Sequence, residues 1–320
     1  MFDLAELEWT HGIVTRSMPP TPQYPWPGLC RRIGCEVWVK HENHTPIGSF
    51  KVRGGLALLD ELRRSGQLPR RIVTATRGNH GQSIPFAARQ LGVPVTVLVP
   101  KGNSVEKNEA MVGWGAEVVE FGADFDEARV EAQRRASHGD AFGVPAFHPA
   151  LVRGAATYAL ELFRAVADLD TLYVPIGLGS GICGAIRTRD LLGLGTEIVG
   201  VVAARAPAMA RSFAAGRVVA TKSAATFADG IACRVPLEEP LEIVRKGAAR
   251  MVEVSEAEIA EAMRALYRCT HNVAEGAGAA AFAALSQEGS RTAGRRVGVI
   301  LSGGNVDADV FRSVLAGEVS

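Results

Sequence analysis

The chain has 320 residues, a near-balanced formal charge of +1 and 47% hydrophobic residues, which is typical of a globular protein of one or two domains. This charge balance and the lack of RNP, zinc-finger or basic-helix motifs argue against nucleic acid as a partner. The longest apolar runs are strand-sized, so a membrane partner is not expected either.

The cysteines and the first residues indicate the compartment. The chain starts with acids where a signal peptide would carry a basic region and an apolar run. The cysteines are odd in number and form no CxxC pair, which indicates reduced thiols rather than a disulfide framework or a zinc site. They are Cys30, Cys35, Cys183, Cys233 and Cys269. We therefore expect a cytoplasmic protein.

Strand and helix patterns alternate from about residue 50 onward. Short branched runs predict strands at 72–76, 95–100 and 118–121, with helices at 81–91, 105–114 and 125–135. A second series contains the helix 151–166 and strands at 172–176, 198–203 and 297–301, with helices at 257–269 and 277–285 between the last two strands. The alternation predicts an α/β protein with two parallel-sheet units, and ligand sites prefer the interface between such units.

The segment TPIGSFKVRGG, residues 45–55, contains the lysine that first suggests chemistry. Pro46 and Gly48 predict a turn, Ser49 an N-cap, and residues 52–62 the helix that follows. Lys51 would lie in the first helical turn, against the ring of Phe50, where the positive helix end disfavours an ammonium group. A neutral amine at that position would be a nucleophile. The alternative is an ordinary surface lysine.

A glycine-rich loop follows the strand at 172–176 and precedes a helix. Glycines let the backbone approach a ligand closely, and the new helix offers free N–H groups to an anion. The spacing fits neither a dinucleotide fingerprint nor a P-loop, so a compact phosphate monoester is the expected occupant. The residues are Gly177, Leu178, Gly179, Ser180 and Gly181. The alternative is a plain tight turn.

Two further loops repeat the strand–polar–glycine pattern. Residues 74–82 contain Thr76, Asn79 and His80, whose side chains and backbone N–H groups suit a carboxylate. Residues 301–307 contain Ser302 and two glycines near the C-terminus. Each alone would be turn chemistry, but parallel sheets place ligands at the carboxyl ends of their strands, so we expect these loops to form one site.

At this point the chain resembles the fold-type-II pyridoxal-phosphate enzymes, in the serine/threonine dehydratase and serine racemase branch. Four elements carry the resemblance in order: GSFKVRGG, RGNHGQ, PIGLGSGICG and LSGGN. It implies pyridoxal 5′-phosphate as the cofactor and two parallel-sheet α/β domains of tryptophan synthase β-like architecture. A small domain, 71–149, would be inserted in a large cofactor-binding domain made of 1–70 and 150–320. The resemblance also suggests a homodimer.

The resemblance implies roles for the residues already singled out. Lys51 would form the Schiff base with the cofactor and act as the base at Cα, and Ser302 would face the pyridine nitrogen. Phe50 would pack on the pyridine ring, Asn79 would hydrogen-bond its 3′-oxygen, and the backbone of residues 177–181 would hold the phosphate. A hydroxyl at the pyridine nitrogen weakens the electron sink, which favours rapid β-elimination.

On the substrate side, Thr76, Gly78 and His80 resemble the carboxylate site. Glu275 matches an active-site acid of the branch, and Arg129 matches a substrate-side arginine only weakly.

The chain departs from the family at three places. Arg77 stands where serine racemases have their second base, and arginine stays charged at neutral pH. Residues 200–205 lack the acidic metal ligand of many relatives, so no metal is expected. Leu178 replaces a frequent glycine.

These observations predict a dehydratase that converts a β-hydroxy amino acid, such as L-threonine or L-serine, to a 2-oxo acid and ammonia. Arg77 also leaves 3-hydroxyaspartate and 3-phenylserine open as substrates. The alternatives are an amino-acid racemase of the same fold and a non-catalytic protein that binds the cofactor or an amino acid. A nicotinamide-dependent oxidoreductase is the weakest alternative, because the glycine spacing is wrong. Too few residues follow LSGGN for the regulatory domain of biosynthetic threonine dehydratases.

Overall fold

The larger of two sheets has six strands in the order β1-β2-β10-β7-β8-β9, and only β1 runs antiparallel to its neighbour. The computed structural model describes residues 1–138 and 141–319. The strands are β1 (Gln23–Pro25), β2 (Glu36–His41), β7 (Thr171–Pro175), β8 (Glu197–Ala203), β9 (Ala248–Val254) and β10 (Arg296–Leu301).

Helices cover both faces of this sheet, because its parallel strands carry apolar side chains on both sides. On β7, Leu172 and Val174 pack toward α7 (Pro149–Ala165) and α8 (Ser180–Leu191), whereas Tyr173 faces α11 (Glu256–Thr270) and α12 (Gly276–Gln287). Residues 276–285 of α12 are all buried, which explains the run of alanine and glycine in a helix that has no solvent face.

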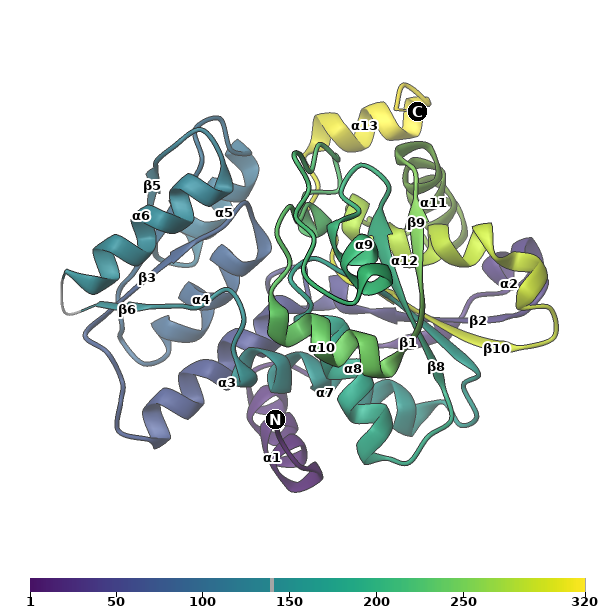
Figure 1. The fold of residues 1–320 in the computed structure, drawn as a ribbon, viewed down its shortest axis with the longest axis horizontal. Helices are drawn as coiled ribbons and strands as arrows, with labels where there is room; N and C mark the ends of the chain where they lie inside the picture. The colour runs from purple at the N-terminus through teal and green to yellow at the C-terminus, as the bar shows by residue number, and fades with distance from the viewer. Residues whose placement is uncertain (139–140, 320) are drawn as a thin grey trace.

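The smaller sheet has four parallel strands in the order β5-β4-β3-β6. They are β3 (Arg71–Ala75), β4 (Val95–Val99), β5 (Ala116–Glu120) and β6 (Ala141–Gly143). One face packs on α6 (Phe125–Ser137), and the other packs on α3 (Lys51–Arg64), α4 (Asn79–Arg89) and α5 (Val105–Gly113). Figure 1 shows this sheet and its helices as a separate lobe beside the larger sheet.

The remaining helices lie around these two layers (Figure 1). They are α1 (Leu4–Ser17), α2 (Pro27–Ile33), α9 (Ala208–Ala215), α10 (Glu238–Gly247) and α13 (Ala308–Ala316), with short 3₁₀ turns η1 (Glu42–His44), η2 (Asp229–Ile231) and η3 (Gly289–Arg291). None of the helices in the described ranges is long and apolar enough to cross a membrane.

The α/β class with two parallel sheets is confirmed, and each strand expected from the sequence occurs within two residues of its predicted ends. The sequence analysis missed β1, β2, β6 and β9, which are either three residues long or contain only short apolar runs next to charged residues. The N-cap assigned to Ser49 is wrong. Ser49 pairs with Gly303 in a β-bridge, and Phe50 takes the cap position without a side-chain hydrogen bond.

Helices α3 and α7 cross closely where both carry glycine. A Cβ on Gly154 would lie 2.6 Å from the carbonyl carbon of Arg53, and because this contact is with backbone, one of the two helices would have to shift. We therefore expect Gly154→Ala to lower the free energy of unfolding by about 1–3 kcal/mol, measured by urea denaturation. Gly12→Ala is the matched control: Gly12 lies in α1 with no atom in reach of an added Cβ, and alanine there should raise stability by about 0.5–1 kcal/mol. Equal effects at the two positions would contradict this account.

Candidate active site

Lys51 is the first residue of α3 and lines a cleft of about 810 Å³ between the two sheets. Its Nζ lies 3.4 Å from Ser180 Oγ and 4.8 Å from the centre of the Phe50 ring. Burial lowers the pKa of Lys51 to about 8, and the charge of Glu275 opposes this shift. About a tenth of the amine is therefore neutral at pH 7, far more than for an ordinary lysine, and the neutral form is the nucleophile.

The glycine-rich loop of residues 177–181 lies beside Lys51, because it contains Ser180. It connects β7 to α8, and Gly179 adopts a φ of +103°, which residues other than glycine rarely do. A Cβ on Gly177 would lie 2.6 Å from the Gly230 carbonyl oxygen, so this position has no room for a side chain. No side chain caps the start of α8, where free N–H groups suit an anion. The loop has the form of a phosphate cradle.

Asn79 stands at the start of α4 with both ends of its amide engaged. Its Nδ2 donates to Glu275 Oε1 over 2.7 Å, and its Oδ1 accepts from Asn305 Nδ2 over 2.7 Å. Asn305 also donates to the Ile47 carbonyl oxygen. The loops of residues 45–50, 76–82 and 301–307 are thereby fixed against one another, although they lie far apart in the chain.

Ser302 follows the last residue of β10, is buried, and lines the same cleft. Its carbonyl oxygen accepts a hydrogen bond from the N–H of Phe50 over 3.0 Å, and Gly304 donates its N–H to the Gly48 carbonyl oxygen. These bonds join the lysine loop to the serine loop. The structure thus places Ser302 on the wall of the cleft to which Phe50 and Lys51 also belong.

Thr76, Gly78 and His80 line the cleft after β3. The N–H of Gly78 donates to Thr76 Oγ1, and His80 Nε2 lies 3.1 Å from Thr74 Oγ1. Burial, with a further contribution from the charge of Lys51, lowers the pKa of His80 to about 3. His80 is therefore neutral at physiological pH and offers hydrogen bonds rather than charge.

Glu275 lies at the N-cap position of α12, is buried, and has an Oε2 atom without a partner among the described residues. Burial raises its pKa to about 7, with a further rise from Asp229 and an opposing effect from Lys107. Lys107 and Asp229 form an ion pair across the cleft. The sequence analysis missed both. Lys107 starts a helix after a strand, which was a usable signal, but Asp229 lies in an irregular segment that carried none.

The raised pKa of Glu275 makes stability depend on pH. Between about pH 4.5 and about pH 7, the folded protein keeps this proton while the unfolded chain loses it, so stability falls as pH rises through that window. Glu275→Gln removes the titrating group and keeps the acceptor for Asn79. We expect the fall to be smaller in this variant, measured by thermal unfolding across the window. If the stability of the wild type and of Glu275→Gln changed equally with pH, the raised pKa of Glu275 would be contradicted.

Three arginines of the described residues line the cleft, Arg77, Arg129 and Arg234. Arg77 is exposed and makes no ion pair or side-chain hydrogen bond within the described residues. Arg129 forms an ion pair with Asp126 over 3.3 Å. Asp126 also pairs with Arg234, which lies in the segment before α10. Arg77 therefore offers an uncompensated positive charge at this rim, as does the exposed Lys222, which lines the cleft and has no ion pair among the described residues.

The end of β8 is where the family resemblance would place an acidic metal ligand. It holds Ala203 and Ala204, whose methyl groups cannot ligate a hard cation. The expected lack of this metal site stays a prediction. We expect EDTA to leave turnover unchanged, and a loss of turnover that magnesium or calcium restores would contradict it.

The fold and the site define an α/β enzyme with a buried reactive lysine beside a phosphate cradle. The model of the family described as "Pyridoxal-phosphate dependent enzyme" matches residues 14–303. The chain belongs to this family, in its serine/threonine dehydratase branch, and it is an enzyme of the ammonia-lyase type.

Several relatives support the assignment to the ammonia-lyase type. The chain is 36% identical over 89% of its length to an L-threonine ammonia-lyase of Geobacter sulfurreducens, covering 71% of that protein. It is 31% identical over 90% of its length to an L-threo-3-hydroxyaspartate ammonia-lyase of Saccharomyces cerevisiae, covering 88% of it. The processed form of threonine deaminase isoform 2 from Solanum lycopersicum superposes with a TM-score of 0.89 at 28% identity, covering 99% of this chain and 95% of that one.

The residues present fit the cofactor that the family implies. Gly177 and Gly179 of the cradle leave no space for a side chain at their positions, and the start of α8, which no described side chain caps, suits its phosphate. Lys51, with its lowered pKa, points to the same place. When bound, pyridoxal phosphate supplies an electron sink that makes the Cα proton of an amino acid acidic.

Proposed function

We propose that this chain removes water and ammonia from a β-hydroxy amino acid, with L-threonine or L-serine as the first candidates. The observation that supports this most directly is the placement of Lys51, whose amine has a pKa lowered to about 8 and lies 3.4 Å from Ser180 Oγ in the phosphate cradle. The names of the relatives, threonine and hydroxyaspartate ammonia-lyases, agree with this substrate class.

Each group in the cleft has a proposed task. The amine of Lys51 takes the proton from Cα, and the β-hydroxyl leaves with a proton as water. The enamine product then takes up water and loses ammonia, which yields a 2-oxo acid. Thr76, Gly78 and His80 hold the substrate carboxylate, with His80 neutral, and Phe50, Asn79 and Ser302 orient the cofactor ring. Glu275 holds Asn79 in place through its 2.7 Å hydrogen bond.

Arg77 bears on the choice between reactions and between substrates. A racemase needs a second base on the opposite face of the substrate, and a charged guanidinium cannot act as one. We therefore propose elimination rather than racemisation. Because Arg77 lacks an ion-pair partner in the described part of the chain, it is placed to bind a carboxylate on the β-carbon. This supports 3-hydroxyaspartate as the second candidate substrate.

The proposal is tested by incubating the purified holoenzyme with L-serine, L-threonine, 3-hydroxyaspartate and 3-phenylserine and measuring the 2-oxo acid released. Release from any of the four supports the dehydratase, and the order of rates identifies the side-chain class. Accumulation of the D-amino acid without 2-oxo acid would favour the racemase. No reaction with any of them would favour a protein that binds but does not catalyse.

Three further assignments are proposals of the same kind. The small domain would comprise 71–149, within a large domain of 1–70 and 150–320, and the two sheets fall on either side of these boundaries. Helix α3 shares its core with the smaller sheet and crosses α7, so it would connect the two. A homodimer is proposed from the family resemblance. Cytoplasmic localisation is proposed because all five cysteines are free thiols.

A further inference from the structure

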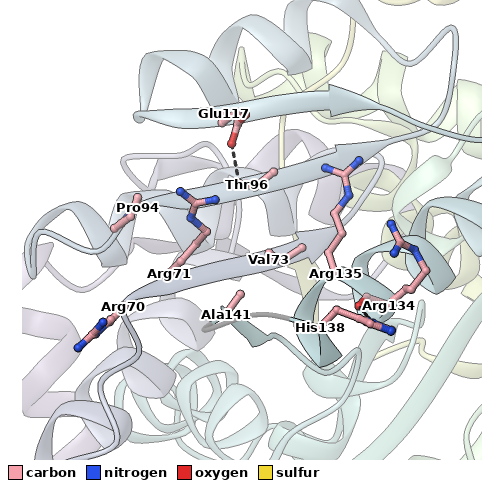
Figure 2. Close-up of a pocket in the computed structure, with 10 residues that line it drawn as sticks. All are labelled: Arg70, Arg71, Val73, Pro94, Thr96, Glu117, Arg134, Arg135, His138 and Ala141. Carbon is pink, nitrogen blue, oxygen red and sulfur yellow. Dashed lines mark hydrogen bonds between the residues drawn. The ribbon is translucent and has the colours of Figure 1, made fainter.

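A second hollow lies at the end of the smaller sheet away from the lysine cleft. Helix α6 packs through Ala128 and Ala132 over the middle of β3 and β4, then ends at Ser137. The beginnings of β3, β4 and β5 are therefore left without a helix on that face. The hollow occupies about 630 Å³. We call it the basic pocket and define it by Arg71, Val73, Thr96, Glu117, Arg135 and His138 (Figure 2).

Two arginines project into the basic pocket from different elements. Arg71 comes from the start of β3 and Arg135 from the end of α6, and Figure 2 shows both extending over the same face of the sheet, on either side of Thr96. Arg71 makes no ion pair or side-chain hydrogen bond with any described residue. Arg135 uses only its Nε, which donates to Glu131 over 2.8 Å. The terminal amino groups of both guanidinium groups are available to a ligand.

Two acids stand near these cations in the part of the chain that the structure describes. Glu117 lines the pocket and accepts a hydrogen bond from Thr96 Oγ1 over 2.7 Å. Glu131 forms ion pairs with Arg134 and Arg135, so two carboxylates face the three guanidinium groups of Arg71, Arg134 and Arg135 among the described residues. The pocket therefore carries a local positive charge within a chain whose formal net charge is only +1. Guanidinium groups with free donors are the preferred partners of phosphate and carboxylate groups.

The volume of the basic pocket and its apolar lining residues limit the kind of ligand that fits it. Its volume lies in the range of small-molecule sites, about 300–1,000 Å³, and exceeds what a bare ion needs. Val73, Pro94 and Ala141 supply an apolar floor between the charged side chains. The geometry points to a small phosphate monoester as the ligand, with its dianionic group between Arg71 and Arg135 and its organic part over Val73 and Ala141.

The basic pocket is distinct from the catalytic machinery. The groups assigned to the reaction follow the carboxyl ends of the strands, whereas Arg71 and Arg135 lie at the other end of β3 and of α6. Val73 and Ala141 line both hollows, which are therefore neighbours, but neither arginine lines the lysine cleft. Variants of the two arginines should therefore leave basal turnover unchanged.

Isothermal titration of the holoenzyme with phenyl phosphate, inorganic phosphate and phenol tests the proposal, because the loaded cofactor occupies the phosphate cradle. We expect phenyl phosphate to bind more tightly than inorganic phosphate, phenol not to bind, and added salt to weaken binding. Arg71→Gln together with Arg135→Gln should weaken the binding of phenyl phosphate by at least about 10-fold, since each lost charged hydrogen bond contributes about 1.5–3 kcal/mol.

Two controls keep the result interpretable. Arg89→Gln removes an arginine of the same lobe that stacks on Trp114 outside the basic pocket, and binding should not change. Arg71→Gln alone should fold normally, because Arg71 has no partner among the described residues, and it should still lose affinity. Equal affinity in wild type and the double variant, or no binding of phenyl phosphate at all, would overturn the proposal.

Discussion

Replacing Lys51 with alanine is expected to lower kcat/KM for 2-oxo acid release by at least about 10³-fold, because one residue serves as both nucleophile and base. The same change should not lower the free energy of unfolding. The amine is buried, its pKa is lowered to about 8, and its single side-chain hydrogen bond, to Ser180, is long at 3.4 Å. Removing the amine therefore removes the free-energy cost of burying it and breaks no strong contact.

The experiment measures steady-state kinetics with the best substrate of the panel, together with urea denaturation. Lys101→Ala is the matched control, since Lys101 is an exposed lysine near the end of β4 and should leave both quantities unchanged. Borohydride reduction followed by mass spectrometry should attach the cofactor to residue 51 in the wild type only. Turnover of the alanine variant near the wild-type rate would refute the assignment of Lys51 and, with it, the proposed mechanism.

Replacing Arg53 with methionine is expected to lower the free energy of unfolding by about 3–5 kcal/mol, because it leaves buried carboxylates without their partner. Arg53 is fully buried two residues after Lys51. Its Nε donates to Glu42 over 2.7 Å, and its terminal amino groups donate to Glu161 over 2.8 and 2.9 Å. Lys40 is the second buried cation, 2.6 Å from Glu161.

The size of this loss should depend on pH. Burial by itself would raise the pKa of Glu161, but the hydrogen bond to His11 and the charges of Arg53 and Lys40 hold it well below its usual range. A carboxyl with a depressed pKa stabilises the fold above its unfolded pKa of about 4.3, and this contribution is lost as pH falls. The difference between wild type and Arg53→Met should therefore narrow below about pH 4.

An exposed ion pair supplies the control for Arg53. Arg312 lies 3.3 Å from Asp309 on α13, with side chains 75% and 92% exposed, so Arg312→Met should change stability by less than about 0.5 kcal/mol. Urea denaturation at neutral and acidic pH measures both variants. A loss at Arg53 as small as the loss at Arg312 would show that the buried network does not stabilise this fold.

The sequence by itself determined the fold class, the family and the cofactor. The strands at 72–76, 95–100 and 172–176 are short runs rich in branched and apolar residues, so the sequence predicts them without tertiary context. The reactive lysine, the glycine loop and the serine loop each lie within a few consecutive residues at a strand end or a helix start. A motif of a few consecutive residues can be recognised from the sequence alone. Parallel sheets then bring such motifs together, because the carboxyl ends of their strands lie at one edge.

Only the tertiary structure decided the features that depend on distant partners. The Lys107–Asp229 ion pair, the proton on Glu275 and the buried network around Arg53 join residues more than a hundred positions apart or depend on exclusion of water. The role of Ser49 changed for the same reason, because its backbone pairs with Gly303. Burial and Coulomb interactions act through space, so no local pattern carries them, whereas periodicity and glycine spacing act along the chain.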